Sequence, residues 1–63
     1  MTSKQQLAAL AVAACKEMVR IGVQHGIESD HARHAAALAD RALTAAENAG
    51  CTIDDYARAR RTH

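Results

Sequence analysis

The 63-residue chain has a formal net charge of +1 and one aromatic residue, and alanine fills about a quarter of its positions. This length allows one domain with a small core, and the alanine-rich, proline-free composition favours helices over strands. The charge gives no overall attraction to nucleic acid or to an anionic membrane. No uncharged apolar run reaches the roughly 18 residues that a membrane-spanning helix needs.

A first helix is predicted over residues 4–25. Ser3 and Gln6 have the spacing of a capping box at its start. Apolar residues at helical spacing form a stripe, which consists of Leu7, Leu10, Ala11, Ala14, Met18 and Ile21. A second apolar set lies beside the stripe and consists of Val12, Cys15, Val19 and Val23. This surface is wider than one packed neighbour requires, so we predict that the second set forms an interface with another chain.

Residues 26–29 are predicted to join two helices as an antiparallel hairpin, because the connection is short. Gly26 suits the end of the first helix, with Ile27 folding back against its last turn, and Ser29 or Asp30 suits the start of the next. The second helix is expected over residues 30–48, with Leu43 at the edge of its inward face. That face would consist of Ala35, Leu38, Ala39, Ala42, Ala45, Ala46 and Ala49. Alanine buries little area, so we expect the hairpin to be weak alone and to assemble into a dimeric helical bundle.

A short third helix is predicted over residues 53–61. Gly50 suits the end of the second helix, and Thr52 with Asp55 has the spacing of a second capping box. Ile53, Tyr56 and Ala57 are expected to dock this helix on the hairpin. Its last turns carry three cations that suit a helix C-terminus and are also the candidate nucleic-acid contacts: Arg58, Arg60 and Arg61.

Three histidines, His25, His31 and His34, are expected near the bend between the first two helices. Three imidazoles at one place could hold zinc or another transition metal. The chain has no HExxH motif and no CxxC pair, so no metal or cofactor is assigned. Cys15, the best nucleophile by residue type, is expected on the apolar flank, where thiols are usually inert. An enzyme is therefore the least expected class of protein.

The segment Val12-Ala13-Ala14-Cys15 resembles the lipobox of bacterial lipoprotein signals, in which the cysteine is acylated after cleavage. The apolar stretch at residues 7–14 is short for such a signal. We therefore expect a cytoplasmic protein and keep the lipoprotein as a minor alternative.

These patterns favour a non-enzymatic protein-interaction module of the adaptor, chaperone or inhibitor type, which dimerises and binds another protein through the apolar flank. The alternative is a regulator that binds RNA or DNA through paired basic faces or the basic C-terminus of a dimer. The length, the hairpin and the opening Met1-Thr2 with Lys4-Gln5 resemble the small RNA-binding plasmid copy-number regulators, which are dimeric helical hairpins. The resemblance ends after that opening, because residues 4–25 contain no aromatic residue, and no family is assigned.

Overall fold

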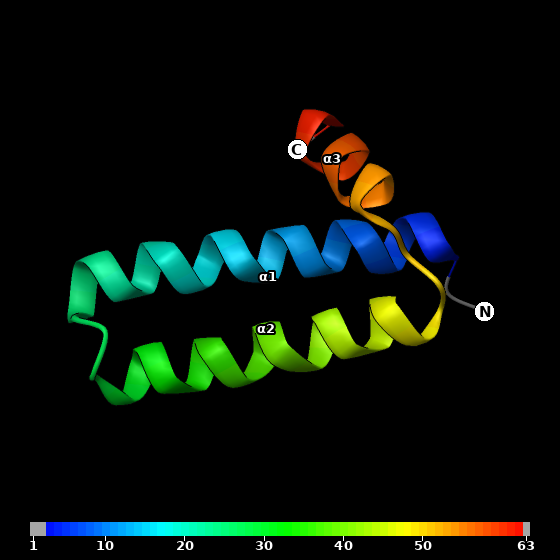
Figure 1. Ribbon diagram of the computed structural model, residues 1–63. Coiled ribbons are helices and arrows are strands. Elements are labelled where there is room, and N and C mark those ends of the chain that lie inside the picture. Colours follow the sequence, from blue (N-terminus) through cyan, green and yellow to red (C-terminus); the bar gives the residue numbers. More distant parts are fainter. Residues whose placement is uncertain (1–2, 63) are drawn as a thin grey trace.

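The computed structural model describes residues 3–62, and this part of the chain forms three helices and no strand. The helices are α1 (Lys4–His25), α2 (Asp30–Asn48) and α3 (Ile53–Thr62) (Figure 1). The prediction of an all-helical fold is confirmed. None of these helices is both long enough and apolar enough to cross a membrane.

Side-chain caps fix the starts of α1 and α2, and a glycine ends α1. Ser3 accepts a hydrogen bond from the Gln6 N–H at 3.1 Å, and the Gln6 side chain accepts one from the Ser3 N–H at 3.0 Å, which completes the capping box. At the other end of α1, Gly26 has a φ of 90° and donates its N–H to the Gly22 carbonyl at 2.9 Å. Ser29 then caps α2 by accepting from the Ala32 N–H at 3.1 Å.

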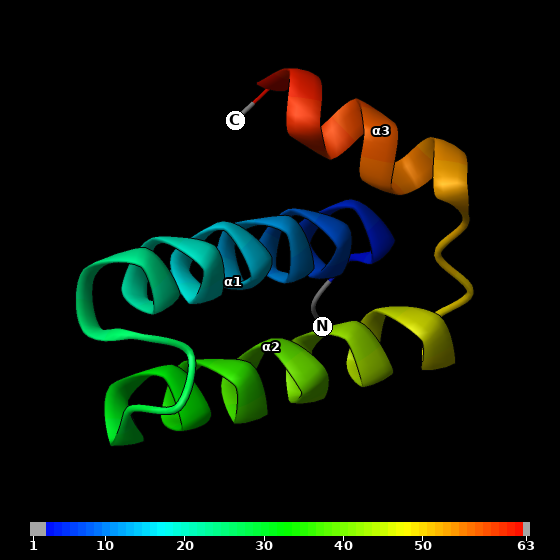
Figure 2. The same ribbon diagram turned by 60° about the vertical axis from the view of Figure 1, so that its left-hand side comes forward.

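Helices α1 and α2 lie side by side along most of their length (Figures 1 and 2). The buried residues of α2 are all small, namely Ala32, Ala35, Ala39 and Ala46. Two leucines expected inside are half exposed, Leu10 at 57% and Leu38 at 48%, and Ala45 and Ala49 are also exposed. That part of the prediction was wrong, because the two helices meet along small residues, whose short side chains set the spacing between the axes.

The connection between α2 and α3 combines a glycine turn with a second capping box. Gly50 has a φ of 88°, and the N–H groups of Gly50 and Cys51 donate to the carbonyls of Glu47 and Ala46, each at 3.0 Å. This is the Schellman arrangement, and it ends α2. Asp55 accepts from the Thr52 N–H at 2.7 Å, and Thr52 accepts from the Asp55 N–H at 3.4 Å.

Helix α3 packs against α1 and, within the described residues, does not pack against α2 (Figure 2). Its contact is a small cluster of Ala8, Val12 and Ala59, with Cys51 and Tyr56 beside it. Lys4 of α1 also forms a 3.4 Å ion pair with Asp55. The N–H of Thr52, the hydroxyl of Thr52 and the nearby Lys4 together hold the pKa of the Asp55 carboxyl below its ordinary value.

The face by which α3 docks differs from the expected one. Ala59 is buried and Tyr56 is half-buried, whereas Ile53 is 85% exposed and Ala57 is exposed. The side of α3 that carries Asp55, Tyr56 and Ala59 faces α1, where Asp55 pairs with Lys4 and Ala59 packs with Ala8 and Val12.

Candidate functional site

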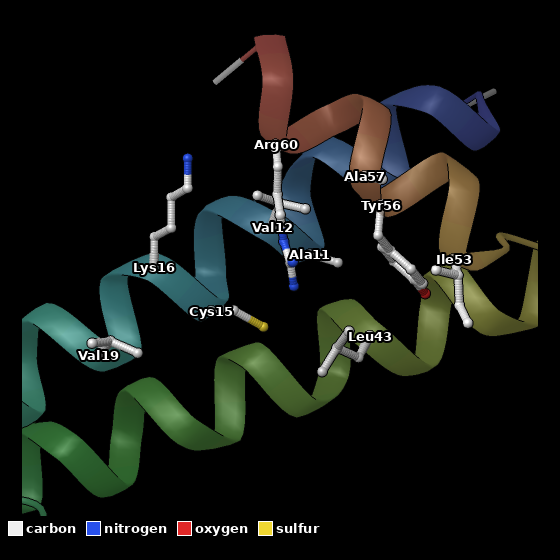
Figure 3. Close-up of a pocket in the computed structure, with 10 residues that line it drawn as sticks. All are labelled: Ala11, Val12, Cys15, Lys16, Val19, Leu43, Ile53, Tyr56, Ala57 and Arg60. Atoms are coloured by element: carbon white, nitrogen blue, oxygen red, sulfur yellow. The ribbon is translucent and has the colours of Figure 1, made fainter.

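The most prominent hollow in the described residues is an apolar groove of about 520 Å³ where the three helices meet (Figure 3). This volume lies in the range of known ligand pockets. Its lining consists of Ala11, Val12, Cys15, Lys16, Val19, Leu43, Ile53, Tyr56, Ala57 and Arg60. We refer to these residues as the groove.

Each helix supplies a different side of the groove. Side chains of α1 form its base, where Val12 and Val19 are seven residues apart and so lie on the same side of the helix. Leu43 projects from α2 along the lower edge in Figure 3. Helix α3 forms the opposite wall, from which Tyr56 points in the direction of α2 with Ile53 beside the end of its ring.

Of the four predicted interface residues, three line the groove and one lies outside it. Val12, Cys15 and Val19 line the groove, whereas Val23 lies one turn beyond Val19, outside the lining. Val12 is only 6% exposed because α3 covers it, so in this chain it contributes mainly to the core. Val19 and Val23 are 61% and 81% exposed and remain available for contact.

Tyr56 is the uncharged polar residue in the wall that α3 forms. Its hydroxyl oxygen is buried and has no hydrogen-bond partner within residues 3–62. An unpartnered buried hydroxyl is uncommon and costs the free energy of its lost hydration. Desolvation, followed by the influence of Cys51, Glu47, Asp55 and Cys15, raises the pKa of the phenol.

This raised pKa predicts an alkaline transition that can be followed at Tyr56 alone, because the chain has no other tyrosine and no tryptophan. The folded protein favours the neutral phenol. The free energy of unfolding should therefore not depend on the ionisation of Tyr56 below pH 10, and it should fall as the pH rises from 10 to the pKa of Tyr56 in the folded state. Absorbance at 295 nm should therefore titrate above pH 10.0 in the native protein and near pH 10 in urea. Coincident midpoints under the two conditions would contradict the buried position of Tyr56. Tyr56→Phe should raise the free energy of unfolding, because it removes the unpartnered hydroxyl.

The lining of the groove contains two charged residues, and both are positive. Lys16 projects from α1 on the side away from Leu43, and Arg60 extends from α3 across α1 towards Ala11 (Figure 3). Neither cation forms an ion pair with another residue of the described chain. The lining therefore combines an apolar surface with two cations that have no carboxylate beside them.

The three C-terminal arginines do not form one basic face. Arg60 lines the groove, whereas Arg58 lines a second depression together with Gln5, Ala9, Asp55 and Ala59. Arg61 is exposed in the last turn of α3. Within residues 3–62, these three arginines therefore project in different directions from α3.

The histidines at the bend do not assemble as a group of three. The rings of His25 and His31 have centroids 4.6 Å apart and are tilted by 38°, and His34 is exposed on α2. Within the described residues, no three His, Cys, Asp or Glu side chains are placed to hold a metal ion. Both Cys15 and Cys51 are free thiols, and Cys51 donates to the Lys4 carbonyl at 3.3 Å.

Sequence patterns identified the base of the groove and missed its wall. Ile53 and Ala57 were assigned to the docking face of α3, and Arg60 to a basic cluster. The sequence pattern that could have identified these wall residues is the 3.6-residue period of α3, which places residues 53, 57 and 60 on one side of the helix.

Comparison of the chain with models of known families, with curated proteins and with solved structures finds no match.

Proposed function

We propose that the protein is a non-enzymatic interaction module, and that its groove binds a helical segment of another protein. The observation that carries this proposal is the apolar groove of about 520 Å³, which continues along α1 into the exposed Val19 and Val23. Amphipathic helices commonly bind in apolar grooves through side chains at i, i+3, i+4 and i+7.

The extent of the apolar surface favours a polypeptide over a small molecule. Along α1 the groove continues past Val12, which α3 largely covers, to the exposed Val19 and Val23, and the distance from Val12 to Val23 is roughly 16 Å, or about three helical turns. A compact ligand in the groove would leave Val23 uncovered, whereas a helix that lies along α1 would cover both Val19 and Val23.

The composition of the core gives a reason for such a partner. Apart from Val12, the buried apolar residues within residues 3–62 are all alanines, and no large side chain is completely buried there. A chain of this length rarely gains more than about 3–5 kcal/mol from its own core. A bound helix would add buried apolar area at about 25 cal/mol per Å².

Homodimerisation, which the sequence favours, is the less suitable use of this groove. A two-fold contact brings the same patch of both copies together. Such a contact would bring four cations, Lys16 and Arg60 from each copy, into one interface whose lining contains no carboxylate, and like charges repel. A dimer through another surface stays a prediction.

The test uses Val19→Asp and a matched control. The probe is a stapled amphipathic peptide of roughly 14 residues, with leucines on one face and glutamines at its edges, because unstapled helices of this length are marginal in water. We expect the wild type to bind it, and Val19→Asp to weaken binding about tenfold or more by placing a carboxylate against apolar side chains. Leu10→Asp is the control, since Leu10 is similarly exposed at 57% but lies on the opposite side of α1.

Binding is measured by amide NMR titration, with the shifts of the groove residues as the readout. Lack of binding by the wild type, or equal losses in the two aspartate variants, would contradict the proposal. Light scattering after size-exclusion chromatography tests whether a second copy of the chain occupies the groove instead. A wild-type dimer that Val19→Asp converts to a monomer would assign the groove to a second copy of the chain.

A further inference from the structure

We infer that the groove selects a helix with carboxylates along one edge, namely the edge that faces Lys16 and Arg60. This inference rests on the proposed function and specifies the chemistry of the partner. It follows from the placement of charge around an otherwise apolar lining.

The two cations belong to different helices and lie on the side of the groove away from Leu43. Lys16 projects from α1 and Arg60 from α3, and both line the groove (Figure 3). A helix that lies on the exposed Val19 would place one of its edges beside these two cations. Carboxylates on that edge would meet one ammonium and one guanidinium group, and a guanidinium can bind a carboxylate through two parallel hydrogen bonds.

The opposite edge of the groove does not offer positive charge. Leu43 forms that edge, and Asp40 shares a shallow depression with Leu43 and Cys15 directly beside it. A carboxylate on the α2 side of the bound helix would therefore approach another carboxylate. Acidic residues are favoured on one edge of the partner only.

Helix α3 provides an example of this recognition within the same chain. It packs on Ala8 and Val12 through Ala59 and Tyr56, and its Asp55 forms an ion pair with Lys4 at 3.4 Å. Helix α1 thus already holds one helix by small apolar contacts and a lysine at the rim. A partner that lies further along α1 would be held by Val19 and Lys16 in the same manner.

The experiment compares two stapled peptides that differ in one edge, which carries glutamines in the first and glutamates in the second. We expect the glutamate peptide to bind the wild type about three- to tenfold more tightly at low salt, as exposed ion pairs usually contribute modestly. The double variant Lys16→Glu with Arg60→Glu should reverse this preference. In 1 M salt, where the Debye length is about 3 Å, the preference should largely disappear.

The matched control is Arg33→Glu with Arg41→Glu, which makes the same change in net charge at exposed positions of α2 outside the groove. It should keep the preference for glutamate, and circular dichroism should show that both double variants remain helical. Equal affinities of the wild type for the two peptides, or a reversal in the control as well, would overturn the inference. Equal binding would leave the proposed function intact, whereas failure of both peptides to bind would remove both proposals.

Discussion

Ala46→Leu is expected to lower the free energy of unfolding by about 1–3 kcal/mol. Ala46 has no exposed surface and belongs to the face of α2 that packs on α1. The additional methyl and methylene groups would have to separate the two helices, because their contact consists of small side chains. A core of this size rarely supplies more than about 3–5 kcal/mol, so the loss would be a large part of the stability.

Ala45→Leu is the matched control, since Ala45 is the preceding residue of α2 and is exposed. Its effect should stay within about 0.5 kcal/mol. Chemical denaturation followed by circular dichroism at 222 nm measures both variants. Equal destabilisation at the two positions would contradict the close contact between α1 and α2.

Gly26→Ala is expected to destabilise the fold by about 1–3 kcal/mol through the backbone alone. Gly26 has a φ of 90° and a ψ of 147°, a region that residues with a Cβ atom rarely adopt. A Cβ atom at this position would have no neighbour within 4 Å, so crowding does not contribute. Thermal denaturation should give a lower midpoint for this variant.

Gly22→Ala should change stability in the opposite direction. Gly22 lies inside α1, and a Cβ atom there would make an ordinary contact at 3.6 Å with Cγ2 of Ile27. Alanine is favoured over glycine in a helix by roughly 0.5–1 kcal/mol. A loss of stability in both glycine variants would indicate that the connection at residues 26–29 has another conformation.

The ends of the helices were predictable because their signals are local. Ser3 with Gln6 and Thr52 with Asp55 form the capping boxes that their spacing indicates, and Ser29 caps α2. Such bonds join groups three residues apart and need no knowledge of the tertiary fold. The positive φ at Gly26 and Gly50 likewise follows from the position of glycine after a helical segment.

The faces of the helices were less predictable because they depend on distant contacts. Alanine occurs around much of α2, so its periodicity does not single out one inward face, and Leu38 and Ala45 were assigned inward. The rotation of α3 brings Asp55 beside Lys4 and Ala59 beside Ala8, which are contacts between residues far apart in the sequence. The wall of the groove was missed for the same reason, whereas its base on α1 followed from an apolar surface too wide for one neighbour.

Because α3 packs on α1 and not on α2 within the described residues, the wall of the groove that α3 forms is separate from the contact that joins α1 and α2. The α3 residues Ile53, Ala57 and Arg60 face the groove and are exposed, so under the proposed function their exchange should alter the choice of partner with little effect on folding. Stability and the proposed recognition thus depend largely on different residues. A scaffold of this kind can acquire new partners by changes in one short helix while the alanine contact between the two long helices stays the same.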